Sequence, residues 1–365
     1  MNLEALLDAA TKVSASDLHL KLGAPPLLRI DTRLRTIDHP PLTAEELRET
    51  ADTYVPQRLR EQFEMSGCTD FAYSTPAGNR FRFAVFHQRG AVSFAIRRIN
   101  PTAPLLQDLN LPPAVANLLN LNRGFVLVTG VTGSGKSTTL AALIQEINIS
   151  RREHIVTVED PIEYMFRDEK AVINQMEVGT DCDSFRNIMQ HIVRFDPDII
   201  MLGEMRNRDT VEAAIAAADT GHLVLSTLHT SDAKQTINRI LHFFEKDEEQ
   251  LILEQLSLNL RAIISQRLLP RSDVKGRIPA IELLMNTPIV SKLIREGRIA
   301  EIQQALKNRD ADMQTFDISL ALLVRENKIS LEVGLKNCAD EAGMRRMIRG
   351  DFSADDKSGL IGGAR

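Results

Sequence analysis

The spacing of hydrophobic residues changes along the chain, and each change marks a different kind of structure. Among the first hundred residues, apolar side chains recur every three or four positions at residues 3–13 and 43–63, and strand-like patterns occur at residues 26–30, 81–86 and 92–99. The first spacing predicts helices, because a helix repeats every 3.6 residues, and the second predicts strands. A short polar turn at residues 87–90 joins the last two strands. We therefore predict a small α/β domain over residues 1–100.

Prolines interrupt this pattern. Four of the fourteen residues 100–113 are proline. Proline lacks a backbone N–H and restricts the residue before it to extended conformations, so this stretch favours an extended connector over a helix. We predict a linker at residues 101–113, followed by a second domain at residues 114–352.

The second domain repeats a strand-then-helix pattern. Its expected strands are short apolar runs at residues 125–129, 154–158, 198–202 and 222–227, and its expected helices occupy residues 138–147, 184–194 and 210–218 and begin again at residue 231. Such uninterrupted runs are typical of a largely parallel sheet buried on both faces. From residue 248 the pattern becomes helical, at residues 251–266, 288–296, 299–307 and 316–325. The polar, Gly-rich residues 353–365 are predicted to form a flexible tail.

Composition narrows the classes of function. The 365 residues are 43% hydrophobic, enough for more than one core, and their formal net charge of −5 disfavours a nucleic-acid partner. Cys68, Cys182 and Cys338 are far apart, which argues against a zinc ribbon or a disulfide framework and favours a reducing cytoplasm. No apolar stretch approaches the roughly 20 residues of a spanning helix. We expect a protein that is soluble or held at a membrane by partners.

A Gly-x-x-x-x-Gly-Lys-Ser motif lies between the first strand and the first helix of the second domain, the setting that a phosphate-binding loop requires. Its glycines let backbone N–H groups surround phosphate oxygens, its lysine reaches the β- and γ-phosphates, and its serine hydroxyl can ligate Mg²⁺. The positive end of the helix dipole adds to this attraction. The predicted nucleotide-binding residues are Gly130, Val131, Thr132, Gly133, Ser134, Gly135, Lys136, Ser137 and Thr138.

Acidic residues follow two other predicted strands. Glu204 ends an apolar run, which is how P-loop proteins bring an acid to the magnesium shell, and its length favours contact through a metal-bound water. Glu159, Asp160 and Glu163 follow another strand and should reach the same edge of the sheet. One of them is expected to orient and deprotonate the attacking water, and the residues by themselves leave open which one. Two of them could instead cap a turn around Pro161.

Two histidines flank the strand at residues 222–227. Seven positions apart on a continuous strand, His222 and His229 would point to opposite faces, so a two-histidine metal site is not expected. His229 lies just beyond the strand and is the better placed to contact the γ-phosphate. For His222, a hydrogen-bonded structural role is an equal alternative.

Phosphoryl transfer also needs positive charge beyond Lys136. The candidates on the strands of the first domain are Arg80, Arg82, Arg97 and Arg98. Alternation places Arg80 and Arg82 on one face and sends Arg97 and Arg98 to opposite faces. Without further context, exposed arginines are more often solvated surface residues.

Together these segments resemble the secretion ATPase superfamily, and within it the type IV pilus retraction ATPases of the PilT/PilU group. The similarity extends over nearly the whole chain, at residues 15–20, 80–82, 130–138, 159–163, 203–204, 221–223, 227–229, 259–268 and 313–317. It implies a PAS-like N-terminal domain, a RecA-like P-loop ATPase domain with a helical C-terminal region, and assembly as a homo-hexamer that hydrolyses ATP with Mg²⁺ to retract pili. It also implies a cytoplasmic location, peripheral at the inner membrane, with the pilus platform protein as a partner.

The resemblance assigns roles to individual residues. It implies that Glu163 is the catalytic base, that Glu204 is the Walker B acid, and that His229 belongs to the histidine box. It further implies that Arg82 and Arg97 are arginine fingers of the N-terminal domain.

One segment departs from the PilT pattern. Residues 288–296 keep only the second half of the Ala-Ile-Arg-Asn-Leu-Ile-Arg-Glu motif, and with residues 242–244 they are more similar to the PilU type, which works beside a second retraction ATPase ring. The alternative function is therefore an accessory ring subunit that binds nucleotide but depends on a partner ATPase, with little turnover of its own. A conjugation-type ATPase acting near DNA is disfavoured by the acidic charge balance.

Overall fold

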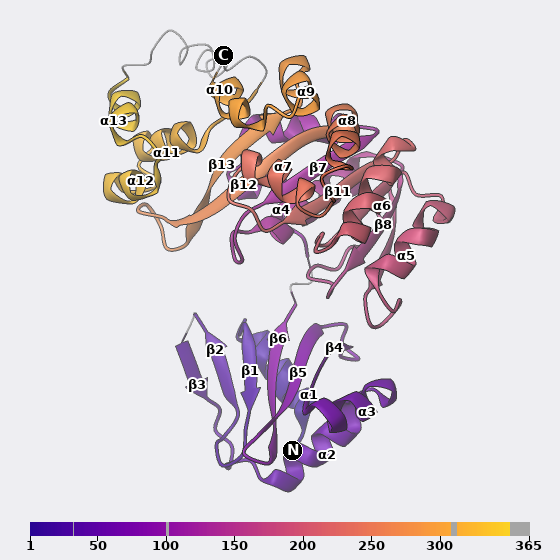
Figure 1. The fold of residues 1–365 in the computed structure, drawn as a ribbon. Helices are drawn as coiled ribbons and strands as arrows, with labels where there is room; N and C mark the ends of the chain where they lie inside the picture. The colour runs from indigo at the N-terminus through magenta and orange to yellow at the C-terminus, as the bar shows by residue number, and fades with distance from the viewer. Residues whose placement is uncertain (32, 100–101, 308–311, 351–365) are drawn as a thin grey trace. The chain divides into compact units, whose positions relative to one another are not determined.

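The computed structural model describes residues 1–31, 33–99, 102–307 and 312–350, which form two compact units (Figure 1). Unit 1 comprises Met1–Thr102 together with Pro161–Phe166 and Glu177–Asp181, and unit 2 comprises Ala103–Asp160, Arg167–Met176 and the chain from Cys182. The predicted tail, residues 353–365, and the first residue of the predicted linker lie outside the described residues. Within those residues, no helix has the length and apolar character needed to cross a membrane.

Unit 1 is built on an antiparallel sheet of six strands in the order β3-β2-β1-β6-β5-β4. The strands are β1 (Asp17–Leu20), β2 (Leu27–Ile30), β3 (Arg33–Thr36), β4 (Cys68–Ser74), β5 (Arg80–Gln88) and β6 (Ala91–Arg98). In β5, Phe81, Phe83 and Val85 are buried and alternate with more exposed residues. This alternation is the expected pattern for a sheet with one covered face.

Three helices pack on the strands of unit 1: α1 (Leu3–Lys12) contacts β1, α2 (Ala44–Tyr54) contacts β6, and α3 (Gln57–Ser66) contacts β4. The prediction of one helix over residues 43–63 was wrong, because two helices occupy that region. Val55, which precedes Pro56, is extended, with a ψ of 119°. A residue before proline is sterically excluded from the helical region, and α2 therefore ends there.

Unit 2 contains a seven-stranded sheet in the order β13-β12-β7-β11-β10-β8-β9. The strands are β7 (Gly124–Thr129), β8 (His154–Glu159), β9 (Val172–Glu177), β10 (Ile199–Leu202), β11 (Leu223–Leu228), β12 (Leu260–Pro270) and β13 (Arg277–Met285). The run from β12 to β8 is parallel, and β13 is antiparallel to β12. Every residue of β7, β10 and β11 is buried, which confirms the predicted parallel sheet of an α/β fold.

The helices of unit 2 include those predicted after each apolar strand and a C-terminal group. They are α4 (Lys136–Ser150), α5 (Phe185–Ile192), α6 (Arg208–Asp219), α7 (Ala233–Leu241), α8 (Glu249–Asn259), α9 (Pro288–Arg295), α10 (Ile302–Lys307), α11 (Phe316–Arg325), α12 (Leu331–Asn337) and α13 (Glu341–Arg349). Short 3-10 helices occupy Leu106–Leu109, Pro113–Asn120, Val193–Phe195 and Ile299–Glu301. The first two show that the Pro-rich stretch is not extended throughout.

A long hairpin replaces part of the predicted helical region. The prediction of a helix over residues 251–266 was wrong beyond Asn259, where α8 ends and β12 begins, and β13 then pairs along β12 (Figure 1, orange). β12 lies beside β7 in the interior of the sheet, and five consecutive residues from Ala262 to Gln266 are buried. Such a run lacks the alternation that distinguishes a strand from a helix, so its pattern was ambiguous.

Candidate active site

The predicted phosphate-binding loop joins β7 to α4 and depends on its glycines for both conformation and space. Gly130, Gly133 and Gly135 have φ angles of 151°, 78° and 91°, a region that other residues rarely adopt. A Cβ on Gly130 would lie 2.5 Å from the backbone oxygen of Gln266, and one on Gly135 would lie 2.7 Å from the Gln266 side-chain nitrogen. The loop is therefore pressed against β12 at its first and last glycine.

Lys136 is the first residue of α4, and only 8% of its surface is exposed. Its Nζ donates hydrogen bonds to the carbonyl oxygens of Gly130 and Val131, at 3.0 and 3.2 Å. The ammonium group is thus held over the loop by the loop's own backbone. Together with the N-terminus of α4, it concentrates positive charge where an anion would meet the loop.

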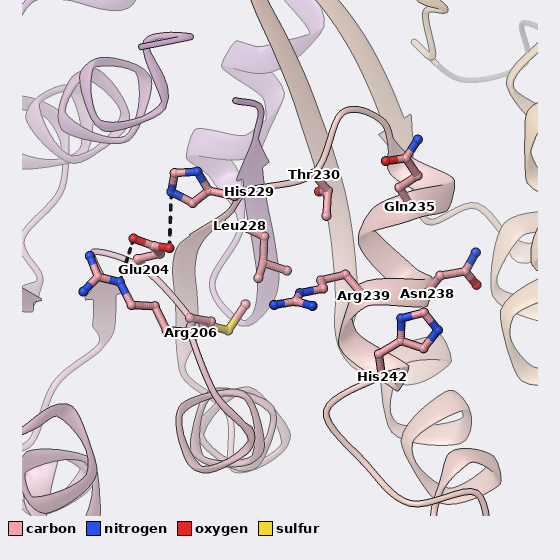
Figure 2. A pocket seen from close by; sticks show the side chains of 10 residues that line it. Glu204, Arg206, Leu228, His229, Thr230, Gln235, Asn238, Arg239 and His242 are labelled. Atoms are coloured by element: carbon pink, nitrogen blue, oxygen red, sulfur yellow. Dashed lines mark hydrogen bonds and ion pairs between the residues drawn. The ribbon is translucent and has the colours of Figure 1, made fainter. Parts of the chain in front are cut away.

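Glu204 and His229, which lie 25 positions apart in the sequence, are brought together at one edge of the sheet. Glu204 follows β10 and His229 follows β11, and Nε2 of His229 lies 3.2 Å from Oε1 of Glu204 (Figure 2). The other ring nitrogen, Nδ1, lies 3.5 Å from the Thr132 hydroxyl in the phosphate loop. The parallel strands β7, β11 and β10 are neighbours, so their carboxyl ends meet, as in other α/β sites.

Arg206 was not predicted from the sequence, yet it holds the second oxygen of Glu204. Its Nε donates to Oε2 of Glu204 at 3.0 Å, and its Nη1 donates to Asp160 at 3.2 Å. The hydrogen bond to Glu204 is the main cause that raises the pKa of the guanidinium, so the group stays charged. The sequence signal that could have identified Arg206 is its position two residues after Glu204, the acid at the end of the strand.

A cleft opens beside this group. Figure 2 shows Glu204, Arg206 and His229 on one side of it and side chains of α7 on the other, namely Gln235, Asn238 and Arg239, with His242 just beyond the helix. The spacing of these four residues places them along one face of the helix. Most of the side chains that line the cleft are polar, and Met205 and Leu228 are its apolar members.

The three candidate acids at the end of β8 and just beyond it have different surroundings. Glu159 is 6% exposed and accepts hydrogen bonds from Thr157 and Gln175, at 2.7 and 3.1 Å, which indicates a structural role. Asp160 is the second partner of Arg206. Glu163 is exposed and belongs to unit 1, where it lines a hollow together with Arg82 and Arg97.

Arg82 and Arg97 are direct cross-strand neighbours on β5 and β6, so they share one face of the unit 1 sheet. Arg97 is also opposite Asp17 of β1, and its Nε lies 3.0 Å from an Asp17 oxygen. Arg80 has a different environment, because it is only 16% exposed and pairs at 2.7 Å with Glu177 of the same unit. Of the four candidate arginines, three line the hollow beside Glu163, namely Arg82, Arg97 and Arg98.

His222 is hydrogen-bonded at the end of α6, which agrees with the structural alternative given above. Its Nδ1 lies 2.9 Å from the Ala217 carbonyl oxygen and 3.1 Å from the Thr220 hydroxyl, at the end of α6. Among the residues that the structure describes, no group of three or more His, Cys, Asp and Glu side chains could hold a metal ion by itself. The hydroxyl of Ser137 and the carboxylate of Glu204 nevertheless offer oxygen atoms, which are the kind of ligand that Mg²⁺ prefers. This small donor set fits an ion held mainly by phosphates and water.

Comparisons with known proteins agree with this geometry. The model of the family described as "Type II/IV secretion system protein" matches residues 2–325. The type IV pilus ATPase PilU of Pseudomonas aeruginosa is 39% identical, covering all of this chain and 96% of PilU. The PilT retraction ATPase of the same organism is 38% identical, covering 91% of this chain and 96% of PilT.

A solved structure of the pilus retraction motor PilT with bound ADP has a TM-score of 0.89 and 40% identity, covering 95% of this chain and all of that one. This similarity confirms the predicted resemblance and the α/β ATPase fold. The chain belongs to the Type II/IV secretion system protein family and, within it, to the PilT/PilU group of P-loop ATPases.

Proposed function

We propose that this protein is a Mg-ATP-hydrolysing motor that assembles as a homo-hexameric ring and drives type IV pilus retraction. The observation that carries the proposal is the meeting of the phosphate loop, Glu204 and His229 at one sheet edge. It is supported by relatives that are named as pilus ATPases and cover nearly the whole chain.

In this proposal, the loop from Gly130 to Thr138 binds the phosphates through its backbone N–H groups, and Lys136 neutralises the charge on the β- and γ-phosphates. Ser137 and Glu204 would hold Mg²⁺, which when bound neutralises phosphate charge during transfer. His229 lies between the loop and Glu204, so it is positioned to contact the γ-phosphate of a bound nucleotide.

We assign the general base to Glu163 and the additional positive charge to Arg82 and Arg97. The support is that these three residues surround one hollow of unit 1, so an acid and two cations can be delivered together. The unit that delivers them belongs to the same chain or to a neighbouring subunit of the ring. A base that orients water and a cation at the γ-phosphate are both required for hydrolysis.

The proposed partners are the pilus platform protein at the inner membrane, with the ring on its cytoplasmic side, and a second retraction ATPase ring. A second candidate function is an accessory ring that binds nucleotide but turns over little without its partner. It is favoured by the α9 segment, where Pro288 starts the helix and Thr287 caps it in place of the first half of the PilT motif. The match to PilU, which extends over the whole chain, also favours it.

The test is steady-state ATPase activity of the purified protein, wild type beside Glu163→Gln, with light scattering after size exclusion on the same samples. A hexamer whose Mg-dependent turnover collapses in the variant would establish an autonomous motor. A hexamer that binds ATP but barely hydrolyses it would favour the accessory ring. A wild-type protein that does not bind nucleotide would refute both.

A further inference from the structure

We propose that Gln266 is a positioning residue that sets the shape of the phosphate loop. The inference rests on the proposed nucleotide-binding role of that loop and adds a residue outside the motif. Gln266 lies in β12, next to the strand that leads into the loop, and it is 3% exposed.

Both ends of the Gln266 amide are engaged at the loop. Its Nε2 donates a hydrogen bond of 2.7 Å to the carbonyl oxygen of Ser134, and its Oε1 accepts one of 2.9 Å from the hydroxyl of Thr139 in the first turn of α4. Ser134 and Thr139 are 2% and 1% exposed. One buried side chain therefore links the loop to the helix that follows it.

The link orients the loop in the direction that phosphate binding requires. A trans peptide is planar, with its carbonyl and N–H on opposite sides. The Ser134 carbonyl points at Gln266, so the N–H of Gly135 in the same peptide points away from β12. Backbone N–H groups directed to one side are what allow such a loop to bind phosphate oxygens.

The contact also explains why the loop closes so tightly on β12. The backbone oxygen of Gln266 occupies the space beside Gly130, and its side-chain nitrogen occupies the space beside Gly135. A shorter side chain would not reach Ser134, and an apolar one would leave a buried carbonyl and a buried hydroxyl without this partner. Glutamate would place a second acceptor opposite the Ser134 carbonyl.

Asn286 is a matched control. Its side-chain amide donates to the backbone carbonyls of Ser257 and Leu260, at 3.0 and 2.8 Å, near the start of β12 and away from the loop. Asn286→Leu and Gln266→Leu therefore remove the same kind of hydrogen bond, but only the second touches the loop.

The experiment measures the Kd of a fluorescent ADP analogue with Mg²⁺, together with kcat, KM and the unfolding temperature without nucleotide. Gln266→Leu is expected to raise the Kd about tenfold, the effect of losing one well-placed hydrogen bond. Thr139→Val should raise it about threefold, Thr139→Ser should restore it, and the double variant should fall short of the product of the two single effects. Asn286→Leu should lower the unfolding temperature and leave the Kd within about twofold of wild type.

A wild-type Kd in Gln266→Leu, or an equal rise in Asn286→Leu, would overturn the inference while leaving the proposed function intact. If Gln266→Leu does not fold, Thr139→Val beside Thr139→Ser decides the question, because the inference requires a rise in Kd in the first and not in the second. Failure of the wild type to bind the ADP analogue would instead refute the proposed function, and this inference with it.

Discussion

His229 and Glu204 form a bridge between two strand ends, with Nε2 of the imidazole 3.2 Å from Oε1 of the carboxylate. The bridge continues to Thr132 of the phosphate loop, 3.5 Å from the other ring nitrogen. The acid that we assign to the magnesium site is therefore connected through one imidazole to the loop that we assign to the phosphates. A movement of Thr132 in the loop can therefore shift Glu204 through the His229 side chain that contacts both residues.

Glu204→Gln tests the assigned role of the acid. The amide keeps the size of the side chain but removes its charge, so we expect kcat for ATP to fall about 100-fold, in line with the loss of one group that stabilises the transition state. The Kd for ADP should stay within a few-fold of wild type. A nucleotide titration that shows lost binding would instead give Glu204 a structural role.

Lys136→Ala should act on binding. The substitution removes the ammonium that lies over the loop and the two hydrogen bonds that it donates to Gly130 and Val131. Loss of one charged hydrogen-bond donor predicts a rise in the Kd for ATP of about 100-fold in a fluorescence titration. Lys292→Ala, an exposed lysine on α9, is the control. An unchanged Kd in Lys136→Ala would contradict the assignment of this loop.

Arg206→Ala separates a role in orientation from a role in stability. Arg206 pairs with both Glu204 and Asp160, but its side chain is 57% exposed, and ion pairs at such positions contribute about 0 to 1 kcal/mol to stability. We expect little change in the unfolding temperature and a fall in kcat of about tenfold, because Glu204 loses one of its two partners. Equal kcat values in variant and wild type would show that His229 alone suffices to orient the acid.

Glu282 predicts a pH dependence of stability. It is 2% exposed and accepts a hydrogen bond from the N–H of Ala233 at the start of α7. Burial raises its pKa to about 7. The hydrogen bond from Ala233 opposes this shift most, Asp232 adds to it, and Arg267 and Gln303 oppose it further. Between the ordinary pKa of about 4.5, which holds in the unfolded chain, and about 7 in the fold, the native state keeps a proton that the unfolded chain has lost. This group therefore makes the free energy of unfolding fall, by about 3 kcal/mol in total, as the pH rises through that interval.

The measurement is urea unfolding of wild type and Glu282→Gln at pH 5 and pH 8. The glutamine amide does not titrate in this pH range, and its oxygen can still accept a hydrogen bond from the N–H of Ala233. The variant should therefore gain stability relative to wild type as the pH is raised. Parallel stability changes in the two proteins would show that Glu282 does not titrate in this interval.

Much of the fold followed from local patterns. Continuous apolar runs predicted β7, β8, β10 and β11 because these strands are buried on both faces, and the Gly-Lys-Ser loop was recognised from consecutive residues. The errors arose where a neighbour decided the structure. The apolar residues after Asn259 suit a helix or a strand equally, and pairing with β7 made them a strand. At residues 43–63 the deciding signal is local, because Pro56 ends the first of the two helices.

The phosphate loop could be predicted from consecutive residues, because φ angles that favour glycine, the strand before the loop and the helix after it are local properties of the chain. The sequence also placed Glu204 and His229 just beyond strands, and hence at one sheet edge. Which side chains meet at that edge depends on the folded structure. Arg206 joins Asp160, 46 positions away, and Gln266 reaches Ser134 across 132 positions. Such contacts depend on strand order and on packing between distant segments, which no spacing of residues along the chain encodes.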